Sequence, residues 1–152
     1  SLEIEGYNIE IVNGSVSGST SAGGLNIAEW TLSENNIDLM ILCLGANDML
    51  RGISPKETKK NLEEIIKIAK SKNIKVIIAG MISPTSYGFS YKNSFDKIFS
   101  DLSKKHKLQL IPFLLEGVAQ KPEFNLSDGM HPNDQGTIII GNTLKKAILK
   151  NL

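Results

Sequence analysis

The 152-residue sequence is short of the residues that cross-link chains, bind metals or span membranes. It has one cysteine, Cys43, so no disulfide can form within the chain, and the apolar run DLMILCLG around it is typical of a buried core thiol. Its two histidines and scattered acids are too few for a zinc site, and we expect no metal and no cofactor. No apolar run approaches the roughly 18 residues of a membrane-spanning helix.

An excess of charge is also missing. Seventeen lysine and arginine residues face sixteen aspartate and glutamate residues, which leaves a net charge of +1. A surface that binds nucleic acid needs a positive excess, because contacts with phosphates dominate its affinity. We therefore expect no nucleic-acid partner and no integral membrane segment. The length favours a single domain over residues 1–152, with one core.

What the sequence does contain is a regular alternation of apolar runs and helical patterns. Apolar runs predict four strands, and two of them, 37–45 and 74–81, are apolar enough to be buried on both faces. Apolar residues spaced i, i+3, i+4 and i+7 predict the helices between them. The strands are expected at 7–13, 37–45, 74–81 and 108–113, and the helices at 21–33, 54–71, after Tyr91 and at 133–150.

This alternation predicts a three-layer α/β domain with a parallel sheet, because parallel strands need crossover helices to connect them. Ligands bind such sheets beyond the carboxyl ends of the strands. The glycine-rich and polar segments of this chain follow predicted strands or precede the last helix, and they lie at 13–24, 45–52, 82–88 and 127–133. They are therefore expected to meet at one edge of the sheet and to form one site.

Two of these segments offer hydrogen-bond donors for a ligand. Gly18 lies in a loop where no side chain of its own obstructs its backbone N–H, and Asn47 follows a predicted strand directly. A backbone N–H beside an asparagine amide would make an oxyanion hole. The alternative is structural: the glycines make turns, and Asn47 satisfies backbone groups of its own loop.

The segment SDGMHPNDQG places an acid, Asp128, three residues before a base, His131. A carboxylate in this position would fix the tautomer of the imidazole and stabilise its protonated form, so that His131 acts as a general base. The alternative is a histidine with a purely structural role. A nucleophile is not evident, because GSVSG has Val16 where the G-x-S-x-G elbow has serine. The glycine-rich loop also lacks the lysine of a P-loop.

Three segments in order, VSGST, GAND and DGMHPN, resemble three of the four conserved blocks of the SGNH (GDSL-type) hydrolases. The sequence between them is most similar to the bacterial thioesterases, lysophospholipases and arylesterases, and the similarity covers nearly the whole chain. It implies a flavodoxin-like α/β/α fold that hydrolyses esters or thioesters of acyl chains through an acyl-enzyme. The resemblance implies that Gly18 and Asn47 donate to the oxyanion. It also implies that His131 deprotonates a serine and that Asp128 orients His131.

The block that carries the family's catalytic serine has no counterpart in this sequence. Under the resemblance, residues 1–8 are the tail of the first helix, and the first strand and the nucleophile loop lie upstream of Ser1. The chain is therefore expected to be an N-terminally truncated domain that is nearly inactive without its serine. Tyr87, Phe89 and Tyr91 are expected to shape the acyl pocket, with core packing as the alternative for Phe89.

Two alternative functions stay open at this point. A carbohydrate acetyl esterase of the same family would use the same groups on acetylated sugars. A flavodoxin-like domain without enzymatic activity could bind a nucleotide or flavin phosphate at GSVSGST, although the Asp128–His131 pair would then have no function. The expected substrate is a small acyl ester or thioester.

Overall fold

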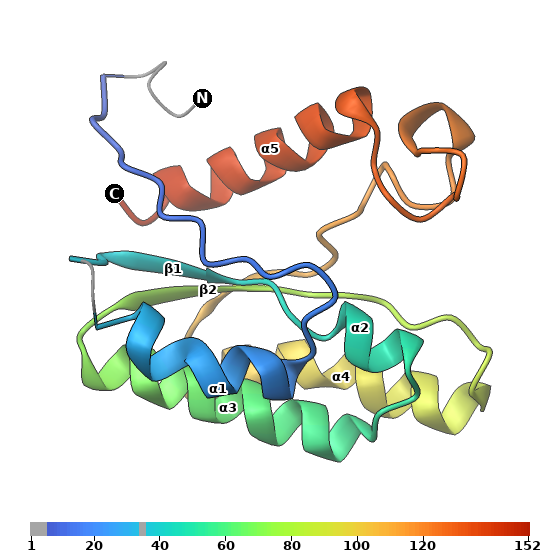
Figure 1. Ribbon diagram of the computed structural model, residues 1–152, viewed down its shortest axis with the longest axis horizontal. Helices are drawn as coiled ribbons and strands as arrows, with labels where there is room; N and C mark the ends of the chain where they lie inside the picture. The colour runs from blue at the N-terminus through green and yellow to red at the C-terminus, as the bar shows by residue number, and fades with distance from the viewer. Residues whose placement is uncertain (1–5, 34–35) are drawn as a thin grey trace.

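The computed structural model describes residues 6–33 and 36–152 and has three layers (Figure 1). A parallel sheet forms the middle layer. Three helices, α1 (Ser21–Thr31), α3 (Pro55–Ser71) and α4 (Gly88–His106), cover one face of the sheet, and α5 (Asp134–Leu149) lies across the other. The loops contain the short helix α2 (Ala46–Leu50) and the 3-10 helix η2 (Pro122–Phe124). This arrangement is the predicted three-layer α/β fold.

Within residues 6–33 and 36–152 the sheet has three parallel strands, paired in the order β1 (Leu39–Leu42), β2 (Lys75–Ala79) and β3 (Gln109–Ile111). In the register of the first pair, Ile41 lies opposite Ile77. β2 is the central strand, and its last four residues are buried, as expected for β-branched and small apolar residues with neighbours on both sides. Three of the four predicted strands are therefore present.

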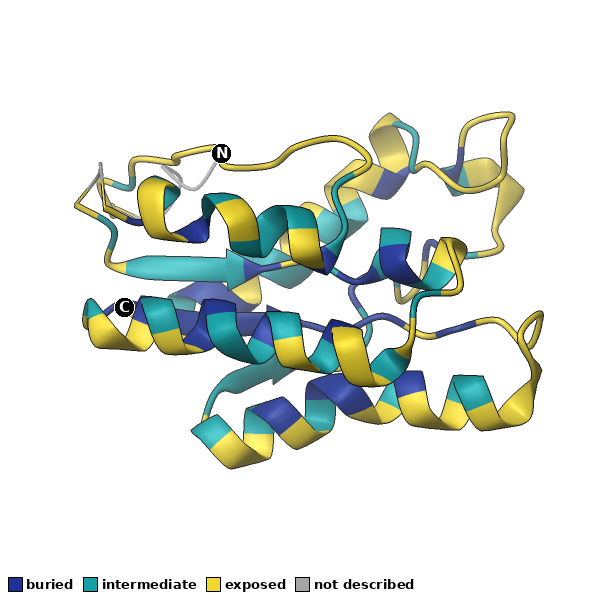
Figure 2. Cartoon of the chain, turned by 60° about the horizontal axis from the view of Figure 1, so that its bottom comes forward, coloured by how far each residue is buried: buried dark blue, intermediate teal, exposed yellow. Residues whose placement is uncertain are grey.

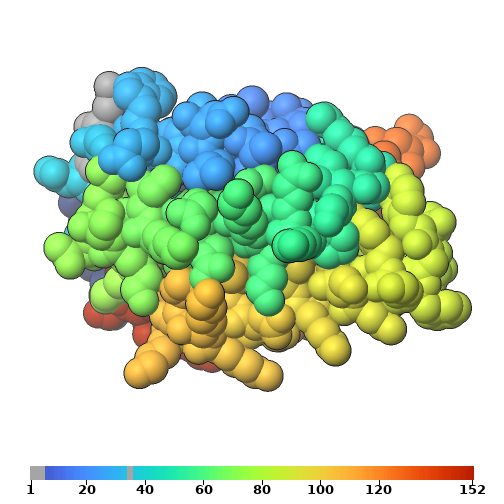
Figure 3. All heavy atoms as spheres, turned by 90° about the horizontal axis from the view of Figure 1, so that it is seen from below, coloured from blue at the N-terminus to red at the C-terminus, as the bar shows by residue number. Residues whose placement is uncertain are grey.

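Each long helix buries one face and exposes the other (Figure 2). In α3 the buried apolar residues are Leu62, Ile65, Ile66 and Ala69, which follow the predicted i, i+3, i+4, i+7 spacing. Figure 3 views the outer side of this layer and shows the side chains of α3 between those of α1 and α4. Among the described residues, no helix combines the length and the apolar character needed to cross a membrane.

Residues 7–13 do not form the strand that their alternating pattern predicts. They run as coil, and Ile11 and Val12 are exposed. A pattern of period two shows only which side chains can share a face, whereas a strand also needs hydrogen bonds from a neighbouring strand. In the part of the chain that the structure describes, β1 pairs with β2 alone. Of the expected helix tail at 1–8, residues 1–5 lie outside the described residues and 6–8 are not helical.

β1 is less buried than its apolar sequence predicts. Leu39, Met40 and Ile41 are only partly buried, and Cys43, which was expected in the core, is exposed. The reason is the place of the strand in the sheet: among the described residues β1 lies at the edge and pairs only with β2, so fewer neighbours cover it than cover β2. An apolar run thus predicts a strand without telling whether that strand is central or at an edge.

Near the amino ends of the strands, a cluster of charges joins α3 to the last turn of α4. The Glu63 carboxylate lies 2.6 Å from Lys105 Nζ and 2.8 Å from His106 Nε2. The hydrogen bond from Lys105, and after it the one from His106, lowers the pKa of Glu63 to about 2. His106 therefore belongs to a structural cluster, far along α4 from the loops that carry the predicted site.

Candidate active site

Gly18 lies in a tight turn just before α1. Ser19 N donates to Val16 O at 3.1 Å, and Gly18 has a φ of +74°, in the left-handed region that side chains disfavour. A type II turn requires this conformation at its third residue, which is why glycine occupies it. The Gly18 N–H donates to no group within residues 6–33 and 36–152, so it is free to donate to a ligand.

Asn47 reaches this turn from α2. Gly45, with a φ of +114°, lets the chain turn sharply from β1 into the helix. Asn47 Nδ2 then donates to Ser19 O at 3.2 Å, across 28 positions of the sequence. Asn47 therefore bonds a backbone group of the glycine turn instead of one in its own loop. Because an amide carries two N–H donors, one remains for a ligand beside Gly18.

Asp48 joins the same two segments beneath the surface. Its fully buried carboxylate accepts hydrogen bonds from Ser21 N at 2.7 Å, from Ser21 Oγ, and from Thr58 Oγ1 at 3.1 Å. Ser21 is the first residue of α1, where the helix dipole favours a negative charge. Asn61 Nδ2 donates to Ser21 Oγ at 3.0 Å and completes the cluster. The acid after Asn47 is visible in the sequence, but its burial and its partners are not.

The predicted acid–base pair is in hydrogen-bonding contact. His131 Nδ1 lies 2.7 Å from Asp128 Oδ2, and Asp128 Oδ1 accepts the backbone N–H groups of His131 at 2.9 Å and Met130 at 2.8 Å. These hydrogen bonds lower the pKa of Asp128 to about 2, and the bond from the His131 backbone N–H contributes most. The carboxylate therefore stays ionised at neutral pH. The His131 side chain is 70% exposed, which leaves Nε2 accessible.

The start of α5 fixes the position of this turn. Leu126 N donates to His131 O at 2.7 Å and closes the loop at its base. Asn133 caps the helix by accepting a hydrogen bond from Gly136 N at 3.0 Å. A Cβ at Gly136 would lie 2.3 Å from Phe124 O, so only glycine lets α5 approach η2 this closely. These contacts fix the loop that carries His131.

The predicted pocket residues lie around the start of α4. Tyr87 OH donates to Leu50 O, at the end of α2, at 3.1 Å. Tyr91 OH donates to Ile53 O, in the segment that follows α2, at 2.9 Å. Phe89 is 73% exposed, and the alternative that it packs in the core is wrong. A role of these residues in binding an acyl chain stays a prediction.

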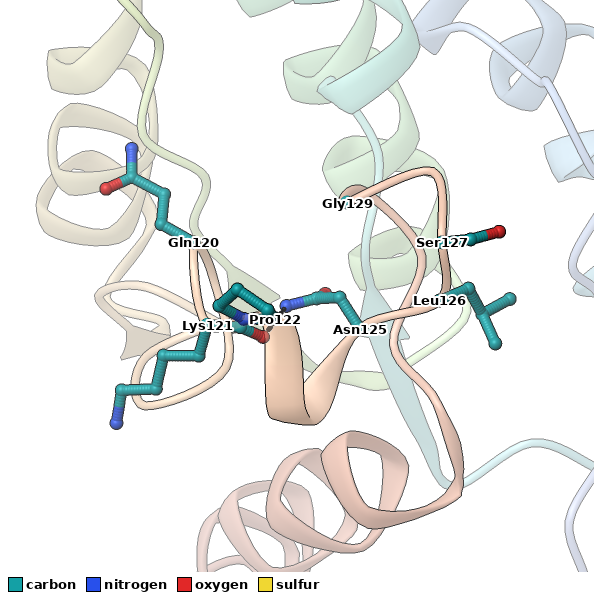
Figure 4. A pocket seen from close by; sticks show the side chains of 7 residues that line it. All are labelled: Gln120, Lys121, Pro122, Asn125, Leu126, Ser127 and Gly129. Atoms are coloured by element: carbon teal, nitrogen blue, oxygen red, sulfur yellow. Dashed lines mark hydrogen bonds between the residues drawn. The ribbon is translucent and has the colours of Figure 1, made fainter.

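An open hollow of about 400 Å³ adjoins the Asp128 turn (Figure 4). Its walls come from residues 120–122, 125–127 and 129, with Lys121 and Ser127 among them. In Figure 4, Asn125 points toward Lys121, and its Nδ2 donates to Lys121 O at 2.7 Å. The side-chain Nδ2 of Asn125 thus bonds the loop itself, to Val118 O and Lys121 O. The hollow includes none of the predicted oxyanion donors or pocket residues.

The candidate site consists of two preformed pairs at the carboxyl edge of the sheet (Figure 1). The turn of Gly18 meets Asn47, and Asp128 meets His131. Within the described ranges, no hydrogen bond joins the two pairs, and none links His131 Nε2 to a hydroxyl group. In the same ranges, no three His, Cys, Asp or Glu side chains are grouped to hold a metal ion.

Comparison with known proteins places this chain in a family. The model of the GDSL-like lipase/acylhydrolase family matches residues 2–137. An arylesterase of Vibrio mimicus is 35% identical over 147 residues, which cover 97% of this chain and 74% of that protein. Thioesterase 1/protease 1/lysophospholipase L1 of Escherichia coli K12 is 33% identical over 138 residues, which cover 91% of this chain and 66% of that enzyme. The crystal structure of TesA matches with a TM-score of 0.92 and 33% identity over 97% of this chain and 82% of its own.

These matches confirm the predicted family, the α/β fold and the ester-hydrolase class. The chain spans about two thirds to three quarters of the length of the two sequence relatives. The likeness extends through all the segments that build the candidate site. The chain belongs to the GDSL-like lipase/acylhydrolase family.

Proposed function

We propose that this chain carries the general base and two oxyanion donors of a serine-dependent hydrolase of carboxylic esters or thioesters. The observation that carries the proposal is the 2.7 Å hydrogen bond between His131 Nδ1 and Asp128 Oδ2. Because the ionised carboxylate can only accept, Nδ1 must be the donor, and Nε2 of the neutral imidazole then bears the free lone pair. An imidazole held in this way can accept the proton of a hydroxyl nucleophile.

The proposed reaction has two stages. His131 Nε2 takes the proton of the serine hydroxyl as the serine oxygen attacks the carbonyl carbon, and the carbonyl oxygen becomes an oxyanion. The oxyanion accepts hydrogen bonds from Gly18 N–H and Asn47 Nδ2. When the intermediate collapses, the alcohol or thiol leaves with the proton from His131. Water then attacks the acyl-serine by the same route, releases the carboxylic acid and restores the serine.

The nucleophilic serine of this proposal lies in a segment outside residues 1–152. Two observations support this part. Among the described residues, no hydroxyl group donates to His131 Nε2, and the relatives are longer than this chain. Residues 1–152 alone are therefore expected to hydrolyse esters at a rate close to the uncatalysed one.

The buried carboxylate of Asp48 opposes the alternative of a phosphate-binding domain. A phosphate bound at residues 13–20 would use the free N–H groups at the start of α1. The first of these, Ser21 N–H, already donates to Asp48 Oδ2 at 2.7 Å. A second anion at this helix end would be repelled by the carboxylate.

The test is the hydrolysis of p-nitrophenyl esters by the full gene product that contains this sequence. His131→Ala should lower kcat by about 10³-fold or more, because the general base is lost, and Asp128→Asn by about 10²–10⁴-fold, because the wrong tautomer is favoured. The chain offers a matched control in His106→Ala. His106 is the only other histidine of the sequence and lies in the Glu63 cluster, so its loss should leave kcat within about twofold. Wild-type rates in His131→Ala would show that the mechanism is wrong.

A further inference from the structure

Arg51 is the only arginine of the sequence, beside sixteen lysines. It follows α2 directly, and its Nη2 donates to Gly18 O at 2.9 Å. A guanidinium is rigid and planar, so a hydrogen bond from one of its nitrogens defines the direction of the group it binds better than a lysine ammonium does. The one arginine thus contacts the residue whose N–H is a predicted oxyanion donor.

Side chains from α2 and from the residue that caps its end hold two successive carbonyl groups of the glycine turn. Arg51 donates to Gly18 O, and Asn47 donates to Ser19 O. Between them, Ser19 N donates to Val16 O at 3.1 Å. The peptide that joins Gly18 to Ser19 is therefore fixed through its C=O by Arg51 and through its N–H by Val16. Both contacts act on the peptide next to the free Gly18 N–H.

The turn needs this outside support because of its glycine. Gly18 requires the left-handed φ of +74°, but a residue without Cβ also reaches many other conformations at little cost. An oxyanion donor contributes only when its direction is set before the reaction, since reorienting it during the reaction would cost part of its effect. A contact at Gly18 O restricts the dihedral angles of Gly18 and so the direction of its N–H.

We infer that Arg51 is a positioning residue, whose guanidinium holds the Gly18 peptide so that Gly18 N–H and Asn47 Nδ2 point at the same oxyanion. The inference rests on the proposed function. It assigns Arg51 no contact with the substrate. The contrasting possibility, that its positive charge attracts or binds the substrate, leads to different kinetics.

The first measurement is steady-state hydrolysis of p-nitrophenyl esters by the full gene product. Arg51→Ala and Arg51→Gln should lower kcat by about 10- to 100-fold, because a misplaced donor acts chiefly on the transition state, and KM should change by less than about threefold. Arg51→Lys should recover part of kcat, since an ammonium can still donate to Gly18 O. Lys56→Gln is the control: it removes one charge from an exposed residue in the first turn of α3, and kcat should stay within about twofold.

Three kinetic results would overturn the inference. One is a kcat within about twofold of wild type in Arg51→Ala. Another is a rise in KM at constant kcat, which would make Arg51 a substrate-binding residue. The third is an equal loss in Lys56→Gln, which would mean that positive charge, not the contact at Gly18 O, matters.

The second measurement does not depend on activity. In the same purified protein, amide hydrogen exchange of Ser19, followed by NMR, reports on the bond from Ser19 N to Val16 O. Arg51→Ala should speed this exchange by about tenfold or more, and Lys56→Gln should not. If wild type and His131→Ala show equal ester hydrolysis, the proposed function fails, while Ser19 exchange still reports whether Arg51 holds the turn. Unchanged Ser19 exchange in Arg51→Ala would refute the role of Arg51 whatever the activity.

Discussion

Replacing Asp48 by alanine should lower the free energy of unfolding by about 3–5 kcal/mol. The effect is large because Asp48 is fully buried and its bonding partners cannot turn to water instead. Its carboxylate accepts hydrogen bonds from Ser21 N, Ser21 Oγ and Thr58 Oγ1. A buried donor that loses its acceptor costs about 1–3 kcal/mol. The two hydroxyl groups can rotate to other acceptors, and Thr58 Oγ1 already donates to Ser54 O at 3.3 Å. Losing the Asp48 acceptor therefore costs each hydroxyl only part of this free energy. Ser21 N–H cannot turn, and a cavity adds to the cost.

Urea unfolding of the full gene product, followed by circular dichroism, measures this loss. Asp48→Asn keeps the size of the side chain and one acceptor for Ser21 N–H, while its NH2 group can donate to the hydroxyl oxygens, so it should lose only about 1–2 kcal/mol. Asp38→Ala is the matched control, because Asp38 is an exposed aspartate just before β1 and should change stability by less than about 0.5 kcal/mol. The reasoning would be refuted if Asp48→Ala were no more destabilising than Asp38→Ala.

Two further predictions concern α3 and α5. Because the pKa of Glu63 is lowered from 4.5 to about 2 in the folded state, its stabilisation is present above pH 4.5 and is lost as the pH falls toward 2. We expect the free energy of unfolding, measured with urea, to fall less between about pH 6 and about pH 3 in Glu63→Gln than in wild type. Glu57→Gln, at an exposed position of the same helix, should lose as much as wild type. Gly136→Ala should cost about 1–3 kcal/mol, because its Cβ would lie 2.3 Å from Phe124 O. Gly141→Ala in the same helix meets nothing within 4 Å and should be neutral or stabilising by up to about 1 kcal/mol, and thermal unfolding of the two variants compares them directly.

The helices follow from local patterns in the sequence. The apolar spacing of α3 is matched by its buried face, and the predicted helix over 133–150 occurs as Asp134–Leu149 behind the cap residue Asn133. Helices are predictable in this way because their hydrogen bonds are formed within the segment itself. The short helix α2 is the exception, since five residues carry too little periodicity to predict it.

The strands show where local patterns stop being sufficient. The alternation at 7–13 predicts a strand, but a strand exists only with a hydrogen-bonded neighbour, and this segment is coil. The same limit explains Cys43, whose apolar surroundings predict burial although it is exposed beyond the end of an edge strand. Neither outcome depends on the residues of the segment alone.

The sequence by itself determined the order of the long helices and of the three strands that form, the family, and the contact between Asp128 and His131. That contact could be predicted because only two positions and a tight turn separate those side chains. That the segments of Gly18 and Asn47 meet at one edge of the sheet was predicted from the sequence, but only the tertiary structure decided the bonds between them: Asn47 to Ser19 O, Ser21 N to Asp48, and Arg51 to Gly18 O. Those contacts join residues 27 to 33 positions apart. They exist because the fold places the start of α1 beside the carboxyl end of β1. The individual partners in these bonds cannot be predicted from the residues of either segment alone.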